Sequence, residues 1–302
     1  MLNLFSVYIT ALATVAPLVM CGGVGFLWGK RKLAFDAEFV STLVTIAGVP
    51  ALIFHTLYTT SIDNSSLLDI SFASTLSIAV SLGLCWLVLK LCRVPIRENW
   101  QLASFPNSGN LGLPLSALAF GEVGLSVAVV FFAVATFLHN TVGLRTISKD
   151  EQGGNAKLLV MGSAVLAVAA RLSGLTLPEW TLNGLELIGS ITVPLMLFSL
   201  GVTLSSISTK GLKAGSFVAT LRLSAGLVSA VIACWILGTT PLLSAIMVLQ
   251  MTMPCAVLGY VYVARYAPSN GQVAASAVLM STLVFLAGSP LLIAALKLAY
   301  NF

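Results

Sequence analysis

Long apolar stretches, each close to the length of a membrane-spanning helix, alternate with short polar loops along almost the whole chain. A helix that crosses the hydrocarbon core of a bilayer needs about 20 mostly apolar residues. The pattern predicts ten such spans, near residues 4–28, 38–60, 70–91, 99–120, 123–144, 157–176, 181–204, 214–237, 241–264 and 272–298. The predicted fold class is therefore an all-α polytopic membrane protein.

The composition excludes the other broad classes of protein. Hydrophobic residues make up 58% of the 302 residues and charged residues only 8%, whereas soluble domains carry about 25% charged residues. Disorder is excluded because it requires low hydrophobicity. The net charge of +5 does not indicate nucleic-acid binding, since the longest basic run is Lys30-Arg31-Lys32. The expected surroundings of the chain are a lipid bilayer.

The basic residues predict how the chain is oriented in that bilayer. Twelve of the 15 Lys and Arg residues lie in the first, third, fifth, seventh and ninth loops between the predicted spans. Loops rich in Lys and Arg stay in the cytoplasm. We therefore predict that both termini lie on the outer side of the membrane.

The polar segment 145–157 divides the chain into two halves of five predicted spans each. An odd number of spans per half places the second half upside down relative to the first, as in transporters built from inverted repeats. One matched segment favours a duplication, because Val49-Pro50-Ala51-Leu52-Ile53-Phe54 resembles Val193-Pro194-Leu195-Met196-Leu197-Phe198. The predicted organisation is a first five-helix repeat (1–148), a cytoplasmic linker (149–156) and an inverted second repeat (157–302).

The fourth predicted span has a composition that an unbroken helix does not tolerate. Its middle reads Pro106-Asn107-Ser108-Gly109-Asn110-Leu111-Gly112-Leu113-Pro114. Proline removes an N–H group and clashes with the preceding turn, so the span is expected to break into two half-helices. Pro114 suits the first turn of the second half, and Ser108 or Asn110 is expected to cap its free N–H groups. Open backbone at membrane depth is tolerated only inside protein or beside a water-filled cavity, which predicts a binding site near the midplane.

The ninth predicted span carries a weaker interruption at the corresponding place. It contains the polar residues Gln250 and Thr252 together with Pro254 and Gly259, and Pro254 is the expected counterpart of Pro106. Paired interruptions in the two halves are the best sequence indication of a transporter's binding site. The predicted helix-breaking residues are Pro106, Pro114, Pro254 and Gly259. Each break joins one positive and one negative helix end, so the dipoles alone leave the sign of the ligand's charge open.

Residues 106–115, Pro-Asn-Ser-Gly-Asn-Leu-Gly-Leu-Pro-Leu, resemble the signature of the auxin efflux carrier family. That family includes the plant PIN exporters and bacterial carriers of malate or malonate. The resemblance implies a fold related to the bile-acid/sodium symporters, in which broken helices 4 and 9 cross inside a mobile transport domain of helices 3–5 and 8–10. Helices 1, 2, 6 and 7 would form a scaffold that often dimerises. The short central loop favours a bacterial carrier of the inner membrane over an auxin exporter.

By the same resemblance, Asn110 and its neighbours would bind the carboxylate of a substrate. The expected substrate-binding residues are Asn107, Ser108, Gly109, Asn110, Gly112, Gln250, Thr252 and Pro254. Three other polar residues within spans are candidates for proton or anion coupling, namely His55, His139 and Arg222. Either histidine could instead form an interhelical hydrogen bond, and Arg222 could instead snorkel to the cytoplasmic face.

No enzyme motif stands out in the sequence. A Walker A loop, a dinucleotide fingerprint, zinc-ligand spacings and a Gly-x-Ser-x-Gly elbow are all missing from the printed sequence, so neither catalysis, a metal nor a cofactor is expected. The favoured function is a secondary carrier of small organic anions, such as mono- or dicarboxylates, that works by an elevator mechanism as a homodimer. The alternatives are a symporter or exchanger of another substrate, coupled to H⁺ or Na⁺, and a ligand sensor that does not transport.

Overall fold

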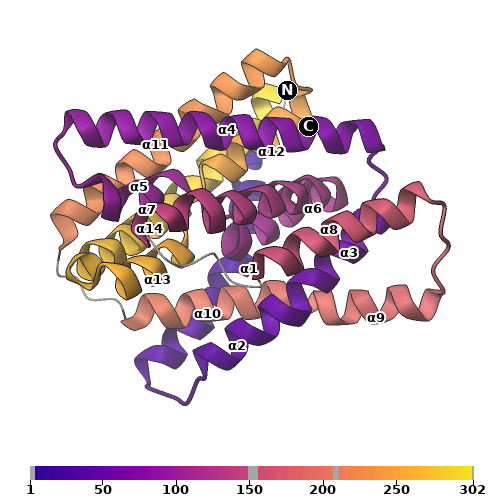
Figure 1. Cartoon of the computed structure of the whole chain (residues 1–302), viewed down its shortest axis with the longest axis horizontal. Coiled ribbons are helices and arrows are strands. Elements are labelled where there is room, and N and C mark those ends of the chain that lie inside the picture. The colour runs from indigo at the N-terminus through magenta and orange to yellow at the C-terminus, as the bar shows by residue number, and fades with distance from the viewer. Residues whose placement is uncertain (1–3, 149–155, 207–210, 301–302) are drawn as a thin grey trace.

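The computed structural model describes residues 4–148, 156–206 and 211–300, and every helix or strand assigned within these ranges is a helix (Figure 1). The first half contains α1 (Leu4–Lys30), α2 (Ala37–Leu43), the π-helix η1 (Val44–Gly48), α3 (Val49–Thr59), α4 (Asn64–Leu91), α5 (Ile96–Ser104), the π-helix η2 (Ser108–Gly112), α6 (Leu113–Leu138), the π-helix η3 (His139–Gly143) and α7 (Leu144–Ile147). The second half contains α8 (Ala156–Leu172), α9 (Glu179–Ser190), α10 (Thr192–Ser206), α11 (Leu212–Leu237), α12 (Pro241–Met251), α13 (Val257–Tyr266), the 3₁₀-helix η4 (Pro268–Asn270) and α14 (Gly271–Tyr300).

Seven helical segments within the described ranges are long and apolar enough to cross a membrane. They comprise residues 11–30, 37–59, 64–91, 108–147, 179–206, 212–237 and 268–299. α8 and α12 are apolar but shorter. The predicted class of polytopic α-helical membrane protein is confirmed at this level. The arrangement as ten spans in two inverted repeats stays a prediction, and all of the predicted linker 149–156 except Ala156 lies outside the described residues.

The segment 108–147 is not one straight helix, because Gly121 interrupts α6. Its backbone has φ 66° and ψ −152°, a conformation that glycine adopts without the cost a side chain brings. Gly121 falls between the fourth and fifth predicted spans, 99–120 and 123–144. The separation of these two spans therefore rests on a single residue that the hydropathy pattern marks only as a short polar gap.

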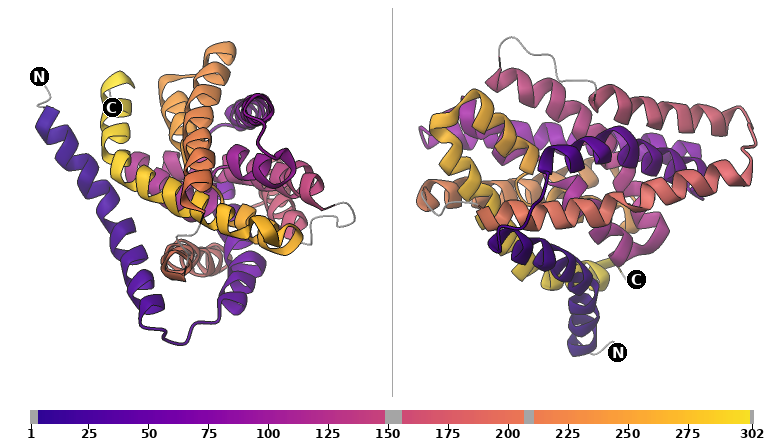
Figure 2. Two further views of the ribbon diagram at one scale, coloured as in Figure 1. Left: turned by 90° about the vertical axis from the view of Figure 1, so that its left-hand side faces the viewer. Right: turned by 90° about the horizontal axis from the view of Figure 1, so that it is seen from below.

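Helices from the two halves of the chain pack against each other throughout the fold. α1 packs along α10, and α3 packs against α8 and α9. α11 contacts α4, α5, α12 and α14. The helices α4, α9 and α10 run in similar directions, whereas α11 is tilted relative to them (Figure 1), and the start of α1 lies near the end of α14 in each view (Figures 1 and 2). One half of each interrupted helix, α5 and α12, thus lies beside α11.

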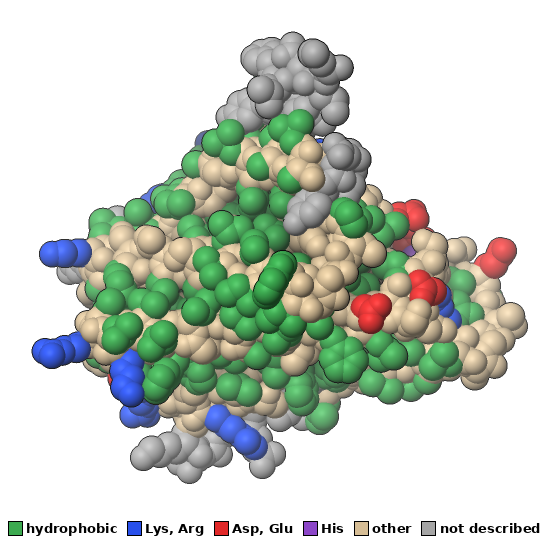
Figure 3. Space-filling view, turned by 90° about the horizontal axis from the view of Figure 1, so that it is seen from above, with side chains coloured by type: hydrophobic (Ala, Val, Ile, Leu, Met, Phe, Trp, Pro, Cys, Tyr) green, Lys and Arg blue, Asp and Glu red, His purple; other side chains and the backbone are tan. Residues whose placement is uncertain are grey.

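Charged side chains separate by sign along the direction of the long helices. On the face shown in Figure 3, Lys and Arg gather at one end and Asp and Glu at the other, with a largely apolar surface between them. α4 has the same polarity, because Asp63 caps its start through the backbone N–H of Ser66 and Lys90 lies in its last turn. An apolar band between two charged ends fits a protein that crosses a bilayer along this direction.

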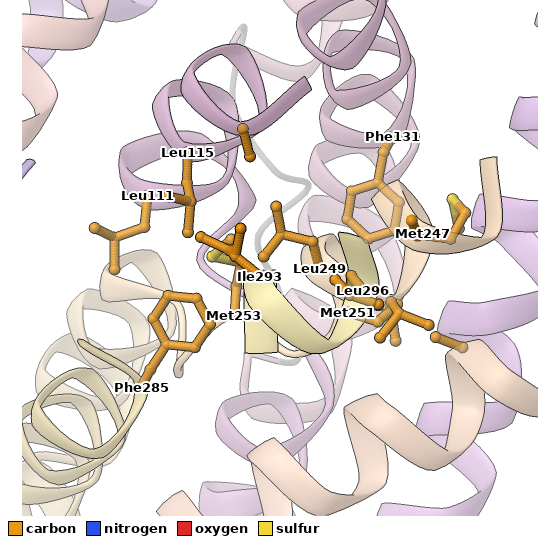
Figure 4. Packing of buried hydrophobic residues seen from close by; sticks show 14 of the residues in the cluster. Leu111, Leu115, Phe131, Met247, Leu249, Met251, Met253, Phe285, Ile293 and Leu296 are labelled. Atoms are coloured by element: carbon orange, nitrogen blue, oxygen red, sulfur yellow. The ribbon is translucent and has the colours of Figure 1, made fainter. Parts of the chain in front are cut away.

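Apolar side chains from both halves meet around the interruptions. Leu111, Leu115 and Phe131 of the first half pack with Met247, Leu249, Met251, Met253, Phe285 and Ile293 of the second half (Figure 4). Most of these side chains are fully buried. Close packing is a main source of helix association inside a membrane, where lipid is as apolar as the protein interior. This cluster holds the breaks in α5–α6 and α12–α13 in fixed contact.

Candidate functional site

The two interrupted segments cross and pair through their backbones. Pro106 forms an isolated antiparallel β-bridge with Cys255, and the backbone N–H of Asn107 donates a hydrogen bond of 2.8 Å to the carbonyl of Pro254. The pairing of the two breaks agrees with the expectation from the sequence. The second segment is outside any helix between Met251, where α12 ends, and Val257, where α13 begins. The second interruption is therefore a full break and not only a kink.

Proline explains why both segments lose their helical conformation at this place. A proline disfavours helical geometry in the preceding residue, and Phe105 is extended, with φ −99° and ψ 125°. Its carbonyl accepts a hydrogen bond of 3.3 Å from the N–H of Ala256 on the other segment. Because Pro106 and Pro254 have no N–H groups, each break leaves fewer donors to satisfy in a membrane interior.

Four half-helix ends converge on the crossing. α5 and α12 reach it with their carboxyl ends, where free carbonyls carry partial negative charge, and η2 and α13 begin there with free N–H groups that carry partial positive charge. The order of elements is the same in both halves, as two inverted copies would require. The two carboxyl ends and the two amino ends have different hydrogen-bond partners in the structure.

The side chain of Arg222 on α11 bonds to both carboxyl ends. Its side chain is fully buried. Nη1 donates to the carbonyls of Ala103 (3.1 Å) and Ser104 and to the hydroxyl of Ser81 (3.4 Å), while Nη2 donates to the carbonyl of Met251 (2.7 Å). The guanidinium thus caps α5 and α12 at once. The alternative that Arg222 snorkels to the cytoplasmic face is wrong, because no part of its side chain is exposed.

The two amino ends at the crossing have no equivalent cap. Neither η2, α6 nor α13 carries a side-chain cap hydrogen bond at its start. The expectation that Ser108 or Asn110 caps the second half-helix is therefore wrong. Ser108 is buried and Asn110 is half-buried. The side-chain amide of Asn107 is buried, and its Nδ2 has no hydrogen-bond partner among the described residues.

Gln250 extends from α12 to the other broken helix. Its side chain is fully buried, and Nε2 donates a hydrogen bond of 2.9 Å to the hydroxyl of Ser116 on α6. Oε1 has no partner in the described part of the chain. Gly112 makes this approach possible, because a Cβ at that position would overlap Oε1 of Gln250. A buried amide left half-satisfied is costly unless a ligand or water completes it.

The remaining predicted site residues lie at or near the ends of the broken helices. Pro114 lies in the first turn of α6, as expected. Thr252 is half-buried, and its hydroxyl donates to the carbonyl of Val248 within its own helix (2.6 Å). Gly259 lies in the first turns of α13, where its carbonyl accepts from Nε2 of Gln101 (3.4 Å). Gly109 packs beneath Met196 and Phe132, next to the crossing.

The two histidines lie in different surroundings. His55 is half-buried on α3, outside the crossing. His139 is buried, with Nε2 at 3.1 Å from Oε1 of Gln101 and its ring stacked on Phe105 at 4.3 Å between centroids. The interhelical hydrogen bond foreseen for His139 is present. Coupling roles for His55, His139 and Arg222 stay predictions.

A cavity of about 250 Å³ lies between α10 and the elements α13, η4 and α14. Its lining includes the hydroxyls of Thr203, Ser206 and Tyr260 and the amide of Gln272. These residues lie next to the seventh and ninth loops of the chain. The lining named for this cavity mixes polar and apolar residues and includes no charged side chain.

Several contributors to the site were not expected from the sequence. Ser81 and Gln101 bond to the crossing from α4 and α5, and Tyr262 donates a hydrogen bond of 2.6 Å to Oδ1 of Asn140, beside His139. All four are polar residues within apolar stretches. Such residues usually face the protein interior in membrane proteins, and that signal could have identified them.

Sequence comparison relates the chain to membrane transport proteins. A family model described as "Membrane transport protein" matches residues 10–158, about half of the chain. An uncharacterized transporter of Methanothermobacter thermautotrophicus is 26% identical over 267 residues, which cover 85% of this chain and 88% of that protein. An uncharacterized transporter of Methanocaldococcus jannaschii is 28% identical over 229 residues, which cover 67% and 70% of the two chains.

The fold and these likenesses define the class of the protein, a polytopic membrane transporter. The matched family contains the auxin efflux carriers, and the family resemblance drawn from residues 106–115 is confirmed by this match. The relatives are archaeal, whereas a bacterial carrier was expected; the source of this chain stays a prediction.

Proposed function

We propose that the protein is a secondary active carrier of small organic anions such as mono- or dicarboxylates. The observation that carries the proposal is the asymmetry of the crossing. Arg222 occupies the carboxyl ends of α5 and α12, while the amino ends of η2 and α13 have no side-chain cap. Helix amino ends favour negative charge. A carboxylate is the ligand of complementary charge.

Three amides are suited to hold such a ligand. Asn110 is half-buried in the middle of η2, and its side chain has no hydrogen-bond partner among the described residues. Nδ2 of Asn107 is a buried donor without an acceptor among the described residues. The amide of Gln250 can turn over and still bond to Ser116, because a hydroxyl both donates and accepts. Neutral donors bind a carboxylate without a second charge that must lose its hydration.

The proposal includes an elevator movement. The moving body comprises α4–α7 and α11–α14, which contain both breaks, and the scaffold comprises α1–α3 and α8–α10, through which two copies form a homodimer. The cavity lined by Thr203, Tyr260 and Gln272 lies on the boundary between these bodies. Since the neighbouring loops are predicted to be cytoplasmic, the cavity is an inward-facing opening. The membrane is the inner membrane of the cell, with both termini outside.

A flux screen in liposomes tests the carrier function. Purified protein is reconstituted and offered labelled mono- and dicarboxylates under imposed proton, sodium or potential gradients. The proposal expects protein-dependent movement of at least one carboxylate. Binding of a carboxylate, detected as a thermal shift, without any movement across the membrane would identify a sensor instead. Movement of cations or neutral solutes alone would favour a symporter or exchanger of another substrate.

The orientation is tested separately with single cysteines on a cysteine-free background. A cysteine at position 149 is expected to react only with reagents that reach the cytoplasm, because its loop is one of the basic ones. Labelling of that cysteine from the outside by an impermeant reagent would contradict the predicted topology and the inverted repeat together.

A further inference from the structure

The carboxyl ends of α5 and α12 together form a place that attracts a cation. Carbonyls of Ala103 and Ser104 from one broken helix face the carbonyl of Met251 from the other across a single guanidinium. In transporters with interrupted helices, unwound carbonyls and half-helix carboxyl ends are the groups that coordinate a coupling cation. The negative partial charge of two helix ends adds to the attraction.

In this protein a side chain already fills that place. Arg222 is fully buried, and its planar fork reaches both helices, with Nη1 on α5 and Nη2 on α12. Arginine stays protonated even in apolar surroundings. The partners of its guanidinium among the described residues are carbonyls and the hydroxyl of Ser81, none of them acidic. The charge of Arg222 is thus balanced by helix ends and not by a carboxylate.

The packing on the α11 side of the guanidinium is tight. Gly226 lies one turn after Arg222 on α11, and a Cβ there would overlap both Nη2 of Arg222 and the carbonyl oxygen of Met251. The glycine lets α11 approach α12 closely enough for the fork to reach Met251. The space between the two helix ends is therefore shaped around the guanidinium.

We propose that the guanidinium of Arg222 is a tethered cation, which occupies the position that a coupling cation would take at this crossing. The protein then binds no free Na⁺ between the two carboxyl ends. The consequence for transport, that anion movement is not coupled to sodium at this site, rests on the proposed carrier function. The occupancy itself does not, and it can be measured without any substrate.

The first test is thermal unfolding of the purified protein in detergent. Wild type, Arg222→Ala and the control Lys213→Ala, an exposed basic residue on the same helix, are compared in sodium chloride, choline chloride and methylguanidinium chloride at equal ionic strength. Arg222→Ala is expected to melt roughly 5–10 °C below wild type in choline, because two helix ends lose their cap. Methylguanidinium or sodium should restore part of that loss, and neither should shift wild type or Lys213→Ala relative to choline.

Two results would overturn the proposal. One is stabilisation of the wild-type protein by sodium relative to choline together with sodium-dependent carboxylate flux, since both require an open cation site. The other is an Arg222→Ala protein that melts with wild type. If Arg222→Ala does not fold, Arg222→Lys decides the matter: it keeps the charge without the fork, so it should fold, melt below wild type and show no stabilisation by sodium relative to choline. An Arg222→Lys protein with the wild-type midpoint, or one that sodium stabilises, contradicts the tethered fork.

The two proposals fail in different ways. If no carboxylate moves through liposomes but the methylguanidinium response is found, the carrier function is wrong and the tethered cation stands. If carboxylates move and their flux by wild type requires sodium, the carrier function stands and the tethered cation is wrong.

Discussion

The two sides of the helix crossing differ more than their symmetry of origin would suggest. On the carboxyl side, the ends of α5 and α12 share one buried cation, and their terminal carbonyls are occupied by Arg222. On the amino side, η2 and α13 start without a side-chain cap, and the buried amides of Asn107 and Gln250 each keep an atom without a partner in the described ranges. On the carboxyl side Nε of Arg222 and the hydroxyl of Ser104 also lack a partner in the described ranges, so the two sides differ in their helix caps and not in the presence of unpaired atoms.

This difference assigns separate tasks to residues that look alike in sequence. Changes on the carboxyl side should affect folding first, because they uncap buried helix ends. Changes on the amino side should affect substrate first and stability little. The predictions below use this distinction, from the largest expected effect to the smallest.

Gly226→Ala should have the largest effect on stability. The new methyl group would overlap the backbone carbonyl of Met251, which cannot move without displacing α12. We expect a loss of about 3 kcal/mol or more, at the upper end of overpacking costs, measured as the unfolding midpoint in detergent. Gly83→Ala on α4 is the control, because a Cβ there meets nothing within 4 Å. Equal midpoints for the two variants would contradict the close packing around Arg222.

Gly112→Ala should affect transport more than stability. Here the methyl group would overlap only the end of the Gln250 side chain, which can swing away. We expect carboxylate flux to fall about tenfold, the equivalent of one hydrogen bond to a charged group. The unfolding midpoint should change by only a few degrees. A variant that melts as early as Gly226→Ala would show that the amino side is structural as well.

His139→Gln should have the smallest effect. A glutamine amide can still bond to Gln101, but it loses the ring stacking on Phe105, so a stability loss of about 1 kcal/mol is expected. Flux between pH 6 and 8 should keep the wild-type profile, because His139 is enclosed by neutral groups in this packing. A wild-type flux that changes with pH in this range, and a variant whose flux does not, would support a proton relay instead.

The class of polytopic α-helical membrane protein could be predicted from the sequence because each membrane span is a long run of apolar residues. The break at residues 106–114 was also predictable, since proline and glycine act locally. The partners of Arg222 could not be predicted. They are the backbone carbonyls of Ala103 and Met251, which lie 119 and 29 residues from Arg222 along the sequence. A backbone acceptor leaves no mark on the residue type that carries it.

The prediction that Ser108 or Asn110 caps the second half-helix was wrong for a related reason. Local rules place a polar side chain at a helix start, but here the crossing segment supplies backbone contacts, and η2 begins with a π-turn closed on the carbonyl of Asn107. Tertiary pairing replaced the local cap. The amide of Asn110 was thereby left without a structural task in the described part of the chain.

Carboxylate binding by Asn110 variants tests the anion site most directly. Asn110→Ala should weaken binding about 10- to 100-fold, as expected for lost hydrogen bonds to a charged group, with the unfolding midpoint within a few degrees of wild type because no cap is removed. Asn110→Asp places a negative charge at the same position and should bind still more weakly. An aspartate variant that binds the carboxylate as tightly as wild type would contradict the assignment of the amino side of the crossing as an anion site.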